Sequence, residues 1–145
     1  MSLNVLVVDD SAVMRAIIVK TLHLSGLPIG EVHQAANGQE GLQVLDDNWI
    51  DLALVDINMP VMGGEEMIDA VRDNPMTSSL SIVVVSTESS DTRVETLHGK
   101  GAQFVHKPFS PEILRETIMG VIGHTGEANN NGSENRALPN SSFDF

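Results

Sequence analysis

Short apolar runs recur along the chain and alternate with longer amphipathic stretches. Three of the runs, residues 5–8, 52–55 and 82–85, are rich in Val, Ile and Leu and have no period-two alternation. That pattern is typical of strands buried on both faces of a parallel sheet. Two weaker runs, residues 31–35 and 103–106, have polar residues interleaved and are predicted to be the outer strands.

The stretches between the runs carry helix signals. One helix is expected to open at Ser11 and to close near Gly26, with Val13, Ile17 and Leu24 on one side. A second is expected to open at Asn37, because an acceptor there with Glu40 three residues later resembles a capping box. Ser110 before Pro111 favours a helix start at that point. The remaining helices are predicted over residues 65–73, 91–100 and 112–121, and Trp49 is expected to cap a helix end.

The order is therefore strand–helix repeated five times. Right-handed crossovers between parallel strands then give an α/β fold, a doubly wound five-stranded sheet with helices on both faces. From residue 124 onward the composition changes to Asn, Ser and Gly, with few apolar residues apart from Leu138, Phe143 and Phe145. We therefore expect one folded domain over residues 1–123 and a polar tail or truncated linker over residues 124–145.

Composition narrows the function. The 145 residues hold 20 Asp+Glu against 8 Lys+Arg, a net charge of −12, which argues against nucleic-acid binding. With no Cys, thiolate metal sites and Cys nucleophiles are excluded. The apolar runs are far short of the ~20 residues of a membrane span, and no signal peptide is visible, so a cytoplasmic protein without membrane association is expected.

The candidate chemistry stands where the strands end. The first strand ends at Asp9 and Asp10, the third at Asp56, the fourth at Ser86 and the fifth at Lys107. Ligands of open parallel sheets bind beyond these carboxyl ends. If the first and third strands are neighbours, about 4.8 Å apart, their three carboxylates need a countercharge. Mg²⁺ is the cation that suits them, with Lys107 as a further positive charge. Taken alone, Asp9 and Asp10 also fit acids that favour a helix start.

A carboxylate beside Mg²⁺ and a lysine is suited to phosphoryl transfer, which depends mainly on positioning and charge neutralisation. An Asp can itself be the nucleophile and form an aspartyl phosphate. Asp56 is the candidate, because Asp9 and Asp10 are better placed as metal ligands. Ser86 and Lys107 are then expected to bind phosphoryl oxygens.

These residues resemble a known family. Asp9-Asp10, Asp56 with Asn58-Met59-Pro60 and Gly63-Gly64, Ser86-Thr87-Glu88, and Lys107-Pro108-Phe109 together resemble the CheY-like receiver domain of two-component response regulators. The resemblance covers roughly residues 4–123, and the joint presence of the motifs in order makes it specific. It implies the flavodoxin-like strand order 2-1-3-4-5.

The resemblance also implies roles for single residues. Asp56 is implied to be the phosphoacceptor. Asp10, Asp56 and the backbone carbonyl of Asn58 are implied to bind Mg²⁺, with Asp9 reaching it through water.

The remaining implied roles concern a conformational switch. Ser86 matches the switch hydroxyl, Phe104 the switch aromatic and Lys107 the lysine that contacts the phosphoryl group, with a cis bond before Pro108. Phe104 stands where Tyr is common, so its ring has no hydroxyl, and Thr87 stands where a smaller residue is common, which narrows access to Asp56.

The resulting hypothesis is a switch domain, not an enzyme, that assists its own phosphorylation and dephosphorylation. Its implied partners are a sensor histidine kinase or a histidine phosphotransfer protein, and a downstream protein target. The target is expected on the face of the fourth helix, fifth strand and fifth helix, around residues 91–100, 104–106 and 112–119. Two alternatives stay open: a Mg²⁺-dependent phosphohydrolase with an Asp nucleophile, and a static interaction module with a receiver fold.

Overall fold

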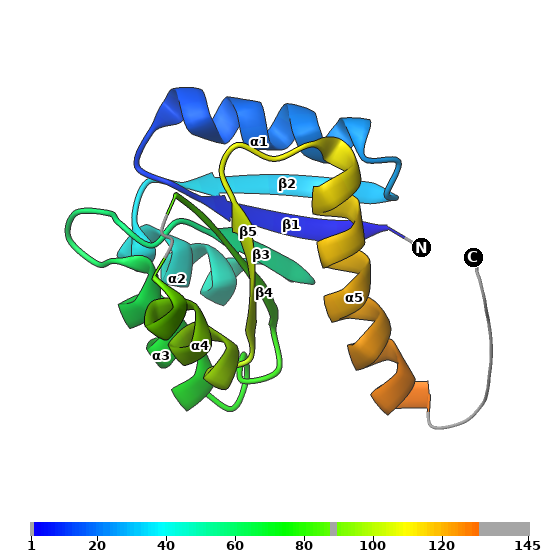
Figure 1. Cartoon of the computed structure of the whole chain (residues 1–145). Helices are drawn as coiled ribbons and strands as arrows, with labels where there is room; N and C mark the ends of the chain where they lie inside the picture. The colour runs from blue at the N-terminus through cyan, green and yellow to red at the C-terminus, as the bar shows by residue number, and fades with distance from the viewer. Residues whose placement is uncertain (1, 88–89, 131–145) are drawn as a thin grey trace.

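Five strands and five helices alternate along the chain in a computed structural model, which describes residues 2–87 and 90–130 (Figure 1). The strands are β1 (Leu3–Val8), β2 (Ile29–Ala35), β3 (Leu52–Val55), β4 (Ser81–Ser86) and β5 (Ala102–His106). The helices are α1 (Ala12–Leu24), α2 (Gly38–Asp47), α3 (Gly64–Asp73), α4 (Asp91–Gly99) and α5 (Pro111–Asn130). The predicted alternation is confirmed, with strand bounds that differ by one or two residues.

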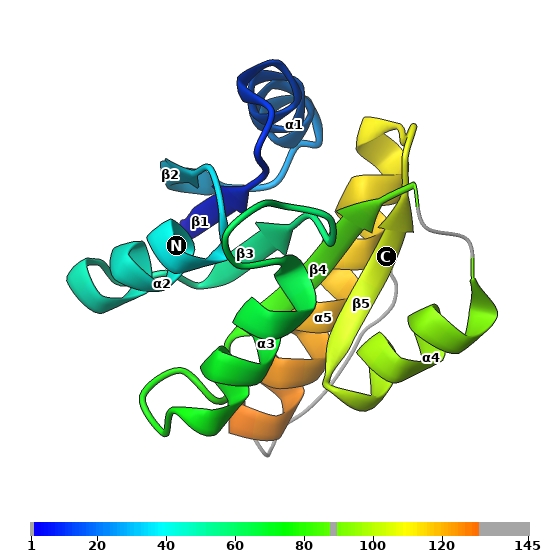
Figure 2. The same ribbon diagram turned by 90° about the vertical axis from the view of Figure 1, so that its left-hand side faces the viewer.

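The five strands form one parallel sheet in the order β2-β1-β3-β4-β5. Helices α1 and α5 cover one face of the sheet, and α2, α3 and α4 cover the other (Figures 1 and 2). Val8 pairs with Val55, and Val55 pairs with Val84, so the central strands end at nearly the same level. The doubly wound fold and its strand order are therefore confirmed.

The central strands separate two hydrophobic cores. Leu6, Val8 and Val55 face the core under α2, α3 and α4, whereas Val7 and Leu54 face the core under α1 and α5. Each of these side chains is at most 1% exposed. Burial on both faces explains why the apolar runs show no alternation with polar residues.

The side of α1 that packs on the sheet differs from the expectation. Val13 is 72% exposed, and Ile17 and Leu24 also face solvent, whereas Ile18 and Leu22 are buried. The helix carries apolar residues on both sides, so its pattern does not single out the buried one. The stripe of Val13, Ile17 and Leu24 therefore lies on the surface.

The helix starts agree with the predicted caps. Ser11 and Asn37 accept backbone hydrogen bonds from Met14 and Glu40, at 3.1 and 2.9 Å. The carboxylate of Glu40 returns a contact by accepting from the Ala36 backbone at 3.0 Å. At the other end of α2, Asn48 is the capping residue, so the expectation for Trp49 is wrong.

Helix α5 continues through Asn130, past the expected domain boundary at residue 123. Once a helix is nucleated by packed turns, each further residue adds a hydrogen bond at small cost, which allows this extension. The rest of the expected tail, residues 131–145, lies outside the described residues. Within the described part of the chain, each helix is too short or too polar to cross a bilayer.

Candidate functional site

The carboxyl ends of β1 and β3 bring three acids together. Asp9 and Asp56 each follow the last residue of a strand, and the Asp56 amide donates to the carbonyl of Val8 at 2.9 Å. Asp9, Asp10 and Asp56 each offer a carboxylate oxygen within 4.8 Å of the others. Asp9 and Asp56 are buried, whereas Asp10 is exposed. The arrangement is a set of hard oxygen donors open to solvent on one side.

Lys107 places its charge among these acids. Its ammonium lies 3.2 Å from Oδ2 of Asp9 and 3.9 Å from Oδ1 of Asp56. The backbone fixes the position of Lys107, because its amide donates to the carbonyl of Ser86 at 2.9 Å, across the ends of β4 and β5. The peptide bond between Lys107 and Pro108 is cis, as expected.

Burial raises the pKa of Asp56 above its ordinary value of 3.8, and the negative charge of Asp9 adds to the rise. The charge of Lys107 and the backbone N–H groups of Ile57 and Asn58 oppose it. The Ile57 amide donates to Oδ1 of Asp56 at 2.8 Å. The one positive charge of Lys107 thus lies near two buried carboxylates, Asp9 and Asp56, and cannot neutralise both. The remaining negative charge favours binding of a divalent cation.

Ser86 and Phe104 lie on the adjacent strands β4 and β5, two positions apart in the register. Ser86 is the last residue of β4 and is 1% exposed, so its hydroxyl lies at the buried edge of the site. Phe104 pairs with Val84, is half-buried, and packs against the core under α2, α3 and α4. Its ring lies 5.3 Å from the ring of His106, which faces solvent. Thr87, the residue expected to narrow access, is exposed.

The loop after β3 is held tightly against the site. The Gly64 amide donates to the carbonyl of Ile57 at 3.0 Å, and a side chain at Gly64 would collide with the backbone of Asp56. Val61 adopts a left-handed backbone with φ 69°, a conformation that is costly for a β-branched residue. Asn58 is exposed at the start of this loop. The turn therefore returns to α3 directly beneath the candidate phosphoacceptor.

The sequence reasoning missed Arg15, one turn into α1. Its guanidinium donates to the backbone carbonyl of Asp9 at 2.6 Å and to the side-chain oxygen of Gln34 at 3.0 Å. These bonds tie the end of β1 to the end of β2. The spacing of Arg15 after Ser11 places it on the first turn, but which strand end it reaches depends on the tertiary fold.

Two carboxylates of α3, Glu65 and Asp69, attach it to α4. Oε1 of Glu65 lies 3.1 Å from Nε of Arg93, and Oε2 lies 3.1 Å from Nζ of Lys100. Lys100 also contacts Asp69 at 2.7 Å, and Asp69 and Glu65 raise the pKa of Lys100. Glu65 belongs to the first turn of α3 and so connects the loop after β3 with both ends of α4.

Comparison with known proteins gives one consistent result. Residues 5–119 match the model of the response regulator receiver domain. The chain is 36% identical over 123 residues to the chemotaxis protein CheY1 of Helicobacter pylori strain 26695, covering 83% of this chain and 98% of that protein. It is 34% identical over 132 residues to the transcriptional regulatory protein PrrA of Mycobacterium tuberculosis, covering 90% of this chain and 54% of that protein.

Solved structures agree with this result. The chemotaxis response regulator CheY4 of Vibrio cholerae superposes with a TM-score of 0.73 at 35% identity, covering 83% of this chain and 99% of that chain. A CheY-like receiver domain protein from Methanospirillum hungatei superposes with a TM-score of 0.76 at 25% identity, covering 88% and 99%.

Proposed function

Because the chain belongs to the response regulator receiver family, we propose that Asp56 accepts the phosphoryl group in two-component signalling. A carboxylate oxygen of Asp56 attacks the phosphorus of a donor phosphohistidine. The new O–P bond forms as the N–P bond breaks, and the leaving imidazole nitrogen keeps the electron pair. The observation that supports this most is the position of Asp56, buried between Asp9 and Lys107 at the end of a central strand.

The donor set fits Mg²⁺, which receiver domains bind at an acidic pocket. We assign Asp10, Asp56 and the carbonyl of Asn58 as its ligands, with Asp9 joined to it through water. When bound, the ion offsets negative charge on the carboxylates and on the phosphoryl oxygens. This chain's own contribution is to hold the acids in place, through the backbone bonds of Asp9 and Asp56 and through Arg15.

Lys107 is the residue of this chain that offsets negative charge on Asp56 and on the phosphoryl group. Its ammonium is 3.9 Å from Asp56, so a phosphoryl oxygen on Asp56 comes within its reach after a small movement away from Asp9. A charge-assisted bond of this kind is roughly twice as strong as a neutral one. Lys107 and Ser86 are therefore the groups that bind the phosphoryl oxygens and assist both its addition and its removal.

The signal leaves the site through Ser86 and Phe104. When the Ser86 hydroxyl turns toward the phosphoryl group, space opens beside β4, and the half-buried ring of Phe104 moves into it. The phosphoryl group favours this state only by its differential affinity for it. A ring without a hydroxyl enters the core without burying an unpaired donor, so the inward state is populated in part without phosphate.

The face formed by α4, β5 and α5 then meets the downstream target. Receiver domains in general interact with histidine kinases and with downstream targets. For this chain we propose a sensor histidine kinase or a histidine phosphotransfer protein as the donor. Exposed Val13 and Val61 stand on the segments that follow β1 and β3, the two strands whose ends carry the acids, and would offer such a donor an apolar contact.

A phosphohydrolase is not favoured. Phosphohydrolases of the haloacid-dehalogenase type carry a second acid two residues after the nucleophile, and that position holds Asn58. Receiver domains are phosphoacceptor switches rather than enzymes in the usual sense. We place the receiver unit within residues 1–123.

Intact mass spectrometry after incubation with acetyl phosphate and Mg²⁺ tests the assignment of Asp56. The wild-type chain is expected to gain one phosphoryl group, and Asp56→Asn none. Asp46→Asn, which changes an exposed acid of α2, is the matched control and is expected to behave as wild type. Unchanged incorporation in Asp56→Asn would contradict the assignment.

A further inference from the structure

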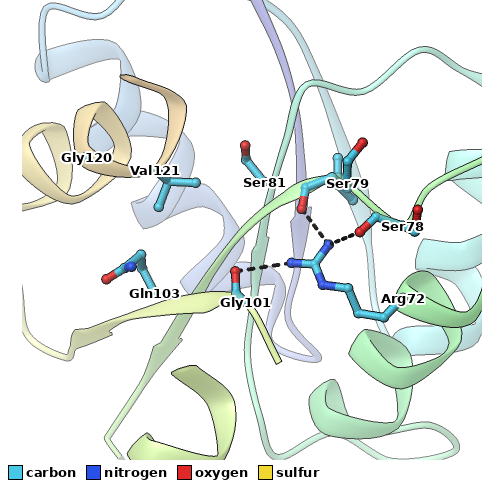
Figure 3. Close-up of a pocket in the computed structure, with 9 residues that line it drawn as sticks. Arg72, Ser78, Ser79, Ser81, Gly101, Gln103, Gly120 and Val121 are labelled. Atoms are coloured by element: carbon cyan, nitrogen blue, oxygen red, sulfur yellow. Dashed lines mark hydrogen bonds between the residues drawn. The ribbon is translucent and has the colours of Figure 1, made fainter. Parts of the chain in front are cut away.

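The end of the sheet opposite the phosphorylation site is hollowed. One hollow, of about 540 Å³, lies where β4 and β5 begin and is lined by Arg72, Gln103, Gly120 and Val121 among others (Figure 3). A second, of about 330 Å³, is lined by Leu45, Trp49, Ile50 and Met76 among others. The two share Ser79, Leu80 and Ser81, so they form one continuous trough from α5 to the loop after α2.

Two large apolar side chains are exposed at this trough. Trp49 is 77% exposed and Met76 is 89% exposed, although both line the second hollow. The indole N–H of Trp49 donates to Oδ1 of Asp51 at 3.0 Å, which fixes the ring and satisfies its polar atom. An exposed aromatic ring whose polar atom is already satisfied offers a large, fixed contact area to an apolar side chain, beside a hollow that is lined by both polar and apolar residues.

The residues that line the trough carry little net charge, so the trough does not repel a segment of this acidic chain. Arg72 is its cation, and its guanidinium donates to the carbonyls of Ser78 and Gly101 at 3.0 and 3.2 Å (Figure 3). Among the described residues no carboxylate lies within ion-pair distance of Arg72. Asp51 is the one acid in the lining, so the trough is close to neutral in a chain of net charge −12.

The chain itself carries a segment that matches this surface. Residues 131–145 follow α5 directly, and they are polar apart from Ala137, Leu138, Pro139, Phe143 and Phe145. Two of the four phenylalanines of the whole chain thus stand among its last three residues. We propose that residues 131–145 bind in the trough, with Phe143 and Phe145 against Trp49, Met76 and the second hollow.

The segment is long enough to reach. Helix α5 lines the trough at Val121 and extends about 14 Å beyond it to Asn130, at 1.5 Å per residue. Crossing from β5 to β3 takes about 10 Å, two strand spacings. The thirteen residues from 131 to 143 span up to roughly 43 Å when extended, so the aromatic residues reach Trp49 with chain to spare. The short tether also gives an effective concentration in the millimolar range, so a weak contact suffices.

Trp49 is the only tryptophan of the chain and reports on its own surface. The experiment measures its emission maximum and its quenching by acrylamide in the full chain and in a variant that ends at Asn130. In the full chain we expect a blue-shifted maximum and weak quenching. In the shortened variant we expect a red shift and the strong quenching of an indole that is 77% exposed. Equal quenching in the two proteins would overturn the proposal.

Two paired variants test the anchors. Phe143→Ala with Phe145→Ala is expected to behave as the shortened variant, whereas Ser141→Ala with Ser142→Ala is expected to behave as the full chain. Shielding that survives loss of both phenylalanines, or that grows with protein concentration because the segment of a second copy binds, would contradict the proposal. No phosphoryl donor or metal is present in these measurements, so their outcome does not depend on the function of Asp56.

Discussion

The ammonium of Lys107 lies 3.2 Å from a carboxylate oxygen of Asp9, closer than the 3.9 Å that separates it from Asp56. Both partners come from strand ends 98 residues apart in the chain, and both side chains are largely buried. In the unphosphorylated protein, Lys107 therefore pairs mainly with Asp9. The proposed phosphoryl group on Asp56 would compete with Asp9 for the same ammonium, and this competition would link the chemistry of the site to its stability.

Loss of the Lys107 charge is expected to destabilise the metal-free protein. Lys107→Met leaves the buried carboxylate of Asp9 without its cation and removes the charge that lowers the pKa of Asp56. A buried acceptor left unpaired costs about 1–3 kcal/mol. Urea unfolding in EDTA measures the change, with Lys20→Met as the control at an exposed lysine. Equal unfolding free energies for Lys107→Met and the control would show that the contact is not stabilising.

Mg²⁺ is expected to raise the stability of the fold, because Asp10 and Asp56, its proposed carboxylate ligands, come together with Asp9 only in the folded chain. At a hundredfold excess over Kd the gain is about 2.7 kcal/mol. Asp10→Ala is expected to lose most of the Mg²⁺-dependent rise in melting temperature, while Asp46→Ala keeps it. A wild-type melting temperature that does not respond to Mg²⁺ would exclude a metal site here.

In the metal-free protein, stability is expected to depend on the ionisation of Asp56. Burial raises its pKa in the folded state, so the folded chain holds this proton more tightly than the unfolded chain. The resulting stability is present below the unfolded pKa of about 3.8 and is lost as pH rises through the folded pKa.

Asp56→Asn should therefore be more stable than wild type at neutral pH in EDTA, and this difference should shrink as pH falls toward 3.8. Urea unfolding at several pH values, with Asp46→Asn as control, measures it. A difference that grows as pH falls would mean that the fold stabilises ionised Asp56, the opposite of what its burial predicts.

The ion pairs of Glu65 with Arg93 and Lys100 are expected to slow the local opening of α4. Glu65→Gln removes the ion pairs with Arg93 and Lys100, each worth up to about 1 kcal/mol at a partly exposed position. Amide hydrogen exchange of α4 should then speed up by roughly fivefold for each kcal/mol lost. Glu66→Gln, at the exposed neighbouring position, is the control. Exchange in α4 that is the same in both variants would mean that Glu65 does not hold this helix.

Much of this fold follows from local patterns in the sequence. The runs around Val7, Leu54 and Val84 are apolar without alternation because both faces of the sheet are covered, and that pattern predicts a parallel sheet. The acids and the lysine directly follow the apolar runs, and parallel strands end at one edge of the sheet, so their sequence positions predict that these side chains lie close together. The strand order came from the resemblance.

Other features depend on tertiary contacts that no local pattern encodes. Helix α1 is apolar on two sides, and only packing decides that Ile18 is buried while Ile17 is exposed. Arg15 reaches the carbonyl of Asp9, and Glu65 reaches both ends of α4, because the fold brings distant segments together. The long side chains of Arg15 and Glu65 find partners that are near in the fold but distant in the sequence.

A phosphoryl group on Asp56 is proposed to change the face formed by α4, β5 and α5. The most direct test compares NMR spectra of the Mg²⁺-bound protein with and without beryllofluoride, which mimics the phosphoryl group. We predict shifts around Asp10, Asp56 and Ser86 and also across residues 94–98 and 104–106; in Ser86→Ala only the distant shifts should be lost. Shifts confined to the loops around Asp56 in the wild-type protein would show that the phosphoryl group does not alter this face.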